Sequence, residues 1–266
     1  MELGDGDVSK GSWRAADAHH GAAFLGPAEL AWEFLRRNPD YQAAFTAHPR
    51  TTDRGTAGPA RRWGLRFLAD PRQAADEAVV FWHPEELASV IILAPAPTRF
   101  GLEPFVVDDW LMRLPRRSGD DGTHVLLKDG KVRYQILLTT PPKNGAARHA
   151  VVPLDVTTPR RAHATHEFWD YAARGHPRPR FVGASRIERL NMALRVLDLR
   201  SSGASYRDVA QALFGPQAAD GAPWKTAAVR DTVIRLVRTG LFMMRGGYAR
   251  LLGPFRADPS PRSRSP

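Results

Sequence analysis

The sequence predicts an α+β protein with a short N-terminal helical motif, a β-rich middle region and a C-terminal helix-turn-helix that carries a β-hairpin wing. Three observations lead to this prediction. Apolar residues repeat at helical spacing between residues 28 and 47, β-branched and apolar runs dominate residues 78–154, and two helix-capping patterns follow residue 184.

The composition limits the classes of protein to which the chain can belong. With 266 residues and 43% hydrophobic content, it can bury the core of one or two domains. The sequence contains no cysteine, which excludes disulfides, thiolate zinc sites and cysteine nucleophiles. The longest apolar run, residues 90–96, is too short to span a bilayer, and the first residues lack the basic and apolar blocks of a signal peptide. We therefore expect a cytoplasmic, nucleoid-associated protein with no membrane partner.

The first predicted element is a helix from Ala28 to Asn38. Its apolar residues, among them Leu30 and Phe34, form one stripe, and Pro39 ends it. A second short helix at residues 41–47 is predicted to pack against the first. The residues that follow are rich in Thr, Gly, Pro and Arg, a composition typical of a linker.

The middle of the chain is predicted to form strands. The β-branched or apolar runs that indicate them are residues 78–82, 89–93, 124–128, 132–138 and 151–154. Between two of these runs, Lys128-Asp-Gly-Lys131 places Asp-Gly at a two-residue connection, which favours a tight β-hairpin. Residues 161–174 predict a helix that closes at Gly175, and the Pro-rich residues 176–180 predict a stiff extended linker.

Beyond this linker, two helices are predicted from their N-terminal caps. Ser185-Arg-Ile-Glu188 and Ser205-Tyr-Arg-Asp208 both have the form of a capping box. The first helix should end at Gly203 and the second at Gly215-Pro216. Their inward residues should be Ile187, Leu190, Leu194 and Leu197 on the first, and Val209, Ala210, Leu213 and Phe214 on the second.

A third helix and the wing complete the predicted C-terminal region. After a long turn, this helix should begin near Trp224 or Thr226 and end at Gly240. Residues 241–245 and 248–252 are two strand-like runs around Gly-Gly, which indicates a β-hairpin wing.

Positive charge concentrates in the C-terminal third. The whole chain carries +10, while residues 184–266 hold 14 basic and six acidic side chains, which leaves +8. Between Lys225 and Arg256, seven basic residues stand against Asp231 alone. A surface that only faces water would mix the two signs, so this distribution favours contact with the phosphates of a nucleic acid.

The third helix is predicted to read double-stranded DNA. At 100° per residue, its apolar residues fall on one face, and the opposite face is small at its start and basic later. Small residues would let the first turn enter the major groove, and Arg235 and Arg238 would reach base edges or flanking phosphates. Further phosphate contacts are expected from basic side chains and from the amides at the start of the Ser205 helix. The predicted DNA-binding residues are Ser205, Tyr206, Arg207, Lys225, Thr226, Ala228, Arg230, Arg235, Arg238, Arg245 and Arg250.

These features divide the chain into six segments. The predicted segments are a loose N-terminus (1–27), a helical regulator-like motif (28–47), a linker (48–75), a β-rich middle and oligomerisation region (76–180), a winged helix-turn-helix DNA-binding domain (181–256) and a disordered tail (257–266).

Two stretches carry a resemblance to a known family. Residues 31–41, Ala-Trp-Glu-Phe-Leu-Arg-Arg-Asn-Pro-Asp-Tyr, form one, and the middle strands together with residues 186–252 form the other. They resemble the N-terminal regulator-like motif and the C-terminal DNA-binding domain of bacterial transcription factors similar to the RovC activator of type VI secretion, which are related to regulators carried on mobile elements. The resemblance implies promoter binding, homo-oligomerisation and transcriptional activation, and it supplies no residue-level contacts.

No catalytic or metal-binding pattern accompanies these features in the sequence. His163 and His166 lie three residues apart beside Glu167, but a third ligand is not apparent and the segment matches neither zinc-protease motif. The adjacent acids at 108–109 and 120–121 are interpreted as solvated. We therefore expect no enzymatic activity, no metal and no cofactor.

One alternative function stays open, a protein-binding regulator that acts on another transcription factor without a DNA site of its own, as an antiactivator or co-regulator. Trp32, Phe34, Tyr41 and Phe45 would supply its partner-binding face, and Trp32 is the one whose helical position favours exposure. For the DNA-binding function, we expect at least a dimer assembled through the middle β region, because a lone winged domain rarely binds one promoter tightly. RNA polymerase or another regulator stays open as a further partner.

Overall fold

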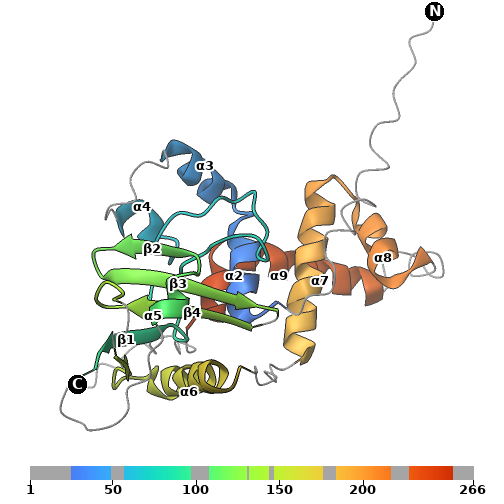
Figure 1. Ribbon diagram of the computed structural model, residues 1–266. Helices are drawn as coiled ribbons and strands as arrows, with labels where there is room; N and C mark the ends of the chain where they lie inside the picture. Colours follow the sequence, from blue (N-terminus) through green and yellow to red (C-terminus); the bar gives the residue numbers. More distant parts are fainter. Residues whose placement is uncertain are drawn as a thin grey trace, which may run out of the picture. The chain divides into compact units, whose positions relative to one another are not determined.

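The structure is a computed structural model that describes residues 25–48, 57–96, 108–130, 132–143, 147–175, 184–216 and 228–253 (Figure 1). The chain divides into two compact units. We call residues 27–180 together with 246–266 the sheet unit, and residues 181–245 together with 1–26 the helical unit. The chain therefore leaves the sheet unit after residue 180 and returns to it at Gly246.

A five-stranded mixed sheet forms the centre of the sheet unit (Figure 1). Its strands are β1 (Ile91–Pro95), β2 (Arg116–Gly119), β3 (Gly122–Asp129), β4 (Val132–Leu138) and β5 (Arg148–Val151). Their order across the sheet is β2-β3-β4-β1-β5. Strands β1 and β4 pair in parallel, and the other pairs are antiparallel. The two edge strands are therefore β2 and β5.

The hairpin predicted between these two runs is confirmed, but its turn lies one residue further along the chain than predicted. Asp129 pairs with Val132 in the antiparallel ladder of β3 and β4, so Asp129 is the last residue of β3 rather than the first residue of the turn. Gly130 has a φ of 54°, in the left-handed region that a tight hairpin turn requires. The connection is local, so the turn sequence alone was enough to predict it.

The predicted strand at residues 78–82 does not join the sheet. It contributes an isolated bridge between Leu65 and Trp82. The side chain of Gln135 on β4 takes the place of a neighbouring strand, because its oxygen accepts from the Trp82 N–H (2.9 Å) and its amide donates to the Trp82 carbonyl (2.6 Å). Since β4 is already paired with β3 and β1, it has no edge left for this run. The run lies over the face of the sheet instead, where Phe81 packs with Leu126.

The predicted strand at residues 151–154 is shifted. Strand β5 ends at Val151, and Pro153, which lacks a backbone N–H, follows shortly after.

Helix α6 (Thr158–Arg174) covers the face of the sheet opposite to Phe81. Phe168 of α6 joins the core that includes Ile91, Ile136 and Leu138. The helix begins with Pro159 in its first turn and ends at Gly175, whose φ of 71° is left-handed, as the sequence predicts. The short helix α5 (Asp108–Leu111) adds Leu111 to the same core.

The N-terminal helices are confirmed, with one change in the exposure of a side chain. The helices are α2 (Pro27–Leu35) and α3 (Pro39–Ala47), and the side chain of Asn38 caps the start of α3. Trp32 is buried and donates from its indole nitrogen to the carbonyl of Gln73 (3.1 Å). The expectation that Trp32 is exposed is therefore wrong, because α2 buries its residues from Leu30 to Leu35 on all sides.

Residues 57–75, which the sequence predicts as part of a linker, are packed into the sheet unit. They begin with helix α4 (Ala57–Arg61), and Leu65 and Phe67 are buried beyond it. The buried Arg66 pairs with Asp120 and Asp121, so these two acids are not merely solvated. Asp121 also contacts Nε2 of His124 (3.0 Å), and burial lowers the pKa of that imidazole below its usual value. A Thr/Gly/Pro/Arg composition therefore does not exclude a packed segment when its few apolar residues reach a core.

Three helices make up the described part of the helical unit. They are α7 (Ala184–Ser201), α8 (Tyr206–Phe214) and α9 (Ala228–Met244). The inward residues predicted for α7 are buried, as are Val209 and Ala210 of α8. Phe214, however, is 44% exposed, although it follows the buried Ala210 by four residues, and it is the last residue of α8. The side chain of Ser185, predicted as a helix cap, lies outside the described residues.

The prediction of a β-hairpin wing at residues 241–252 is wrong. Helix α9 continues through Gly240 to Met244, and Gly247–Leu251 form a 3-10 helix, η4. Gly240 lies inside the helix and not at its end. Its lack of a side chain lets α7 pack directly against α9 at this point. A Cβ at residue 240 would lie 2.7 Å from Cγ of Leu197 and 2.9 Å from the carbonyl oxygen of Ala193. The glycine therefore marks a close helix crossing, which the sequence pattern did not distinguish from a helix end.

The second predicted wing strand belongs instead to the sheet unit. Tyr248 of η4 is buried and donates from its hydroxyl to the carbonyl of Trp63 (3.0 Å). Its ring lies beside Trp82, with 6.0 Å between the centroids, and the carbonyl of Leu252 accepts from the Ala88 N–H (3.2 Å). These contacts anchor residues 248–252 among residues 63–88.

We predict that Gly240→Ala destabilises the helical unit. Alanine favours a helix by about 1 kcal/mol over glycine, but overpacking a tight contact costs about 1–3 kcal/mol, and here one neighbour is a backbone carbonyl that cannot rotate away. Urea denaturation should therefore give a lower free energy of unfolding. The matched control is Gly58→Ala in α4, where a Cβ meets no atom within 4 Å and stability should rise or stay level. Equal effects of the two substitutions would contradict the close crossing.

We also predict that Tyr248→Phe weakens the sheet unit by about 1 kcal/mol, because it removes a partly buried hydrogen bond. Tyr171→Phe is the control, since it removes the same hydroxyl from an exposed bond to Asp129 and should change thermal stability less. If Tyr248→Phe changes stability no more than Tyr171→Phe, then the Tyr248 hydroxyl does not anchor η4.

Candidate nucleic-acid interface

The start of α8 is built as the sequence predicts. Ser205 Oγ accepts from the Asp208 N–H (3.2 Å), and the Asp208 carboxylate accepts from the Ser205 N–H (2.7 Å), so the capping box is confirmed. The backbone N–H groups of Ser205 and Asp208, which were predicted to be available to phosphate, are therefore bonded inside the cap. The carboxylate of Asp208 also adds a negative charge beside them. This arrangement makes the first turn of α8 a weaker anion site than expected.

Tyr206 and Arg207 are exposed at the start of α8. The guanidinium carbon of Arg200 lies 4.7 Å above the ring of Tyr206, and Arg200 also donates to the carbonyl of Ala204. The Tyr206 ring is thus held against α7 and presents its outer part to solvent.

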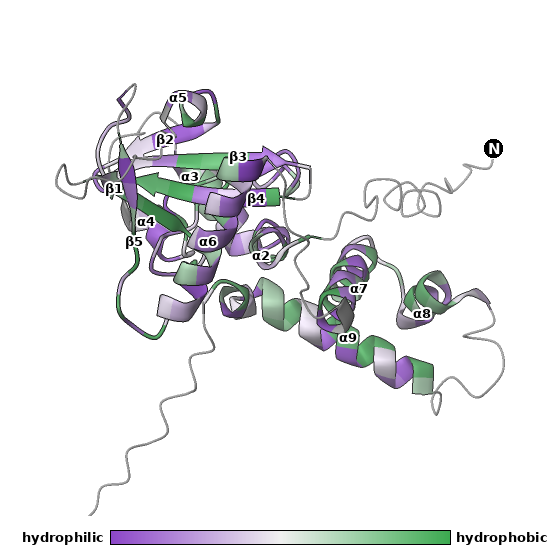
Figure 2. Ribbon diagram, turned by 60° about the horizontal axis from the view of Figure 1, so that its bottom comes forward, coloured by the Kyte–Doolittle hydropathy of each residue, from purple (hydrophilic) through white to green (hydrophobic). Residues whose placement is uncertain are grey.

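Hydrophobic and hydrophilic residues alternate along α9 (Figure 2), and the two faces of the helix differ in exposure. The face toward α7 and α8 holds buried residues, including Val233, Leu236 and Val237, as the sequence predicts. The opposite face is a continuous exposed stripe, which we call the α9 stripe. Its members follow one another at three- and four-residue steps and are Ala228, Asp231, Arg235, Arg238, Phe242 and Arg245.

The α9 stripe is predominantly positive. The one acid in it, Asp231, lies 3.8 Å from the guanidinium of Arg230, and Arg235 contacts Oγ1 of Thr232 (3.3 Å). Arg235 and Arg245 are ten residues apart, which corresponds to about 15 Å along the helix axis. Three arginine side chains are therefore spread over a length of helix comparable with the width of the DNA major groove, which is about 12 Å.

Among the predicted site residues that the structure describes, all but Arg250 belong to the helical unit. Ala228, Arg230, Arg235, Arg238 and Arg245 share α9 or its end, while Ser205, Tyr206 and Arg207 start α8 in the same unit. Arg250 lies on η4 in the sheet unit, in a 3-10 helix where the sequence predicts a strand of the wing. Lys225 and Thr226, with the predicted start of the third helix, fall outside the described residues.

Sequence reasoning missed Phe242, which is 49% exposed within the α9 stripe. The prediction ended the helix at Gly240 and placed Phe242 in a strand. Continuing the helical spacing through the glycine would have found it, because Phe242 follows Arg235 by seven residues and Arg238 by four.

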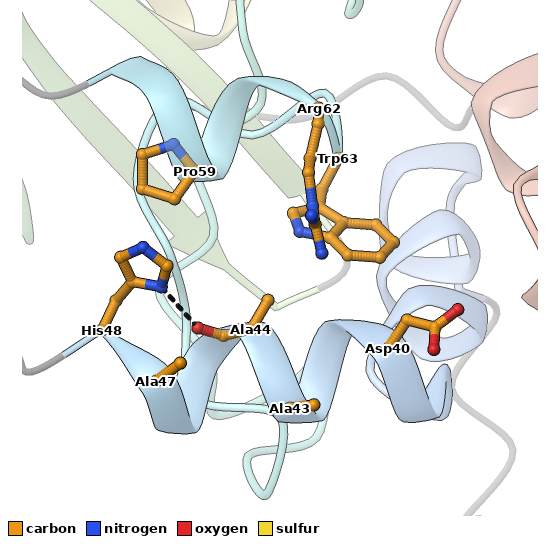
Figure 3. A pocket seen from close by; sticks show the side chains of 8 residues that line it. All are labelled: Asp40, Ala43, Ala44, Ala47, His48, Pro59, Arg62 and Trp63. Carbon is orange, nitrogen blue, oxygen red and sulfur yellow. Dashed lines mark hydrogen bonds between the residues drawn. The ribbon is translucent and has the colours of Figure 1, made fainter.

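A pocket of about 680 Å³ lies in the sheet unit, between α3 and α4 (Figure 3). Ala43, Ala44 and Ala47 line it from α3, and Trp63 faces them with the guanidinium of Arg62 4.4 Å above its ring. The pocket holds none of the predicted DNA-binding residues.

Within the described ranges, no helix has the length and apolar character needed to cross a membrane. Over the same residues, no group of three or more His, Asp or Glu side chains is placed to hold a metal ion. His163 and His166 each lie near an acid of their own helix, Glu167 (3.5 Å) and Asp170 (3.8 Å) respectively.

Comparison with known proteins gives two family matches. Residues 151–253 match RovC_DNA-bd, described as a type VI secretion system (T6SS) transcription factor DNA-binding domain. This match takes in α6, the three helices of the helical unit and η4. Residues 12–68 match the proteobacterial transcriptional regulator-like domain, which takes in α2, α3 and α4. No curated protein gives a significant match.

Both descriptions are those of regulators of transcription rather than of enzymes, and the two matches lie on either side of residues 69–150, which hold most of the sheet. The chain is therefore a DNA-binding transcriptional regulator that combines a RovC-like transcription-factor DNA-binding domain with an N-terminal proteobacterial transcriptional regulator-like domain.

Proposed function

We propose that this regulator is a sequence-specific transcriptional activator that reads the DNA major groove with α9. The observation that carries the proposal is the α9 stripe, in which three arginines stand exposed on a helix whose other face is buried against α7 and α8. A helix docked on two others in this way can insert its outer face into a groove without disturbing the core.

Each part of the stripe suits a different contact. Ala228 leaves room for the backbone of the first described turn to approach the bases, while Arg235 and Arg238 are placed to donate to guanine O6 and N7 or to flanking phosphates. Arg245, about 10 Å further along the axis than Arg238, is suited to a phosphate at the groove edge. Asp231 would accept from cytosine N4, which gives the one acid of the stripe a role in discrimination.

The helices beside α9 add phosphate contacts in this proposal. Tyr206 and Arg207 are exposed at the start of α8, and Lys225 and Thr226 precede α9 in the sequence. Such contacts fix the position of the protein on the duplex and carry no sequence information of their own. The assembly that binds an operator is proposed to contain at least two copies of the chain, since paired half-sites lengthen the sequence that is read.

A second function has one observation in its favour. Phe242 and Phe214 are large apolar side chains exposed on the helical unit, and exposed apolar side chains are typical of protein contact surfaces. The regulator would then act on another transcription factor through one or both of these side chains. A gel-shift assay separates the two functions, because the second predicts no salt-sensitive shift with any fragment of the protein's own upstream region.

Selection of bound sequences from a random DNA pool tests the proposed function directly. We expect recovered sequences to share an inverted or direct repeat, and a promoter containing it to lose expression when the regulator is deleted in the host. Recovery of no common sequence would contradict specific reading. Higher expression after deletion would show repression instead of activation.

We predict that Arg235→Ala reduces affinity for the selected site by about 1–3 kcal/mol and relaxes base preference at one position, because it removes a base contact. Fluorescence anisotropy with the selected site and with single-base variants measures both effects. Arg189→Ala, which removes the same charge from an exposed position of α7, is the matched control and should leave base preference unchanged. If Arg235→Ala keeps full affinity and preference, α9 is not the reading helix.

A further inference from the structure

The two edges of the central sheet differ in how they are protected. Edge strand β2 carries Arg116 and Arg117, and charged side chains on an edge discourage another strand from pairing with it. Edge strand β5 carries His149, Ala150 and Val151, all exposed. Its one arginine, Arg148, is buried. These observations leave β5 without the charged side chains that usually block an edge.

The burial of Arg148 has a clear cause. Its guanidinium donates to Oγ1 of Thr140 (2.7 Å) and to the carbonyl of Pro141 (3.2 Å), so its charge is held inside its own subunit. Two copies of β5 can therefore approach each other without bringing these two charges together at the edge.

The direction of the free backbone groups of β5 follows from its ladder with β1. The Ala96 N–H donates to the Ala147 carbonyl (2.9 Å), and the pairs Ala94–His149 and Ile92–Val151 follow at two-residue steps in the same register. In an antiparallel ladder, hydrogen-bonded and non-hydrogen-bonded pairs alternate. The N–H and C=O groups of the intervening residue, Ala150, therefore point away from β1, toward the outer edge.

An apolar loop follows directly after this edge. Leu154 is 92% exposed and Val156 is 84% exposed. The loop is nevertheless well fixed, because Oδ1 of Asp155 accepts from the Thr157 N–H (2.7 Å), and Oγ1 of Thr158 lies 2.7 Å from the Pro153 carbonyl. A rigid loop that holds two apolar side chains in water is typical of a surface that another molecule covers.

We propose that β5 pairs antiparallel with β5 of a second copy of this chain, about a twofold axis at Ala150. In this pairing the two Ala150 residues exchange both backbone hydrogen bonds, and the sheets of the two copies become one continuous sheet. This inference rests on the assembly of at least two copies in the proposed function, and it adds the surface that joins them.

A second copy fits this edge for three reasons. A twofold axis places donors opposite acceptors on identical antiparallel strands, so the edge is complementary to itself. The pairing opposes no exposed Lys, Arg, Asp or Glu side chains within β5. Leu154 and Val156 of each copy also leave water at the ends of the paired strands. Because each copy contributes a strand of only four residues, the interface is small, and we expect a dissociation constant in the micromolar range.

Analytical ultracentrifugation of the full chain, over a concentration range of about 1–100 μM, tests this pairing. Ala150→Pro removes an N–H that points outward, so it should leave the bonds to β1 intact and raise the dissociation constant of the dimer at least tenfold. Ser118→Pro is the matched control, because by the same alternation its N–H points outward at the opposite edge, on β2. It should leave the dissociation constant unchanged. Leu154→Ser with Val156→Ser, two exposed positions, should weaken the dimer even if Ala150→Pro fails to fold.

A disulfide gives an independent readout, since the chain has no other cysteine. In the proposed pairing the two Cα atoms of residue 150 lie about 5.5 Å apart, within the range that a disulfide spans. Ala150→Cys should form a covalent dimer on mild oxidation, and Ser118→Cys should not. A dimer that all these variants leave unchanged, or one that Ser118→Cys crosslinks and Ala150→Cys does not, would overturn the pairing through β5.

The same experiments separate this inference from the proposed function. A wild-type chain that stays monomeric at 100 μM overturns the β5 pairing, whether or not it binds DNA. DNA affinity and base preference, measured by anisotropy, report on α9 independently. A dimer that Ala150→Pro dissociates, in a protein without specific DNA binding, would support the β5 pairing and contradict the proposed function.

Discussion

The return of the chain into the sheet unit at η4 is the constraint on which the rest of this structure depends. The helical unit is not a domain attached by one linker, because α9 runs to Met244 and the chain is then buried again at Tyr248. The Tyr248 hydroxyl bond to the Trp63 carbonyl and the Leu252 carbonyl bond from the Ala88 N–H fix this return among residues that precede the sheet in sequence. The DNA-binding match at 151–253 takes in parts of both units, which agrees with a domain whose ends belong to the sheet unit.

The elements that could be predicted from the sequence are those set by local chemistry. The hairpin between β3 and β4, the Ser205 capping box and the Gly175 helix end each depend on a few adjacent residues, and each is present, the hairpin turn one residue later than predicted. The buried stripe of α9 was also predictable, because its spacing is helical whatever it packs against. In the candidate site, the same spacing placed Arg235 and Arg238 on the exposed face.

The errors arose where tertiary contacts decide the outcome. Gly240 has the composition of a helix end, but its lack of a side chain serves the crossing with α7, and this is visible only when both helices are in place. Residues 78–82 have the composition of a strand, but β4 has no free edge, so Gln135 satisfies Trp82 through a side chain. Trp32 was expected in solvent because its helix was considered alone, whereas residues 70–76 supply the carbonyl that its indole needs.

The crossing at Gly240 also bears on how regulators of this kind can diversify. The close contact at Gly240 lies on one face of α9, while the exposed α9 stripe lies on the other. Substitutions in the stripe therefore cost little folding stability, and substitutions at residue 240 cost much. A scaffold divided in this way can acquire new operator preferences by ordinary point mutation, and an engineer can exchange the stripe residues as a set without redesigning the core.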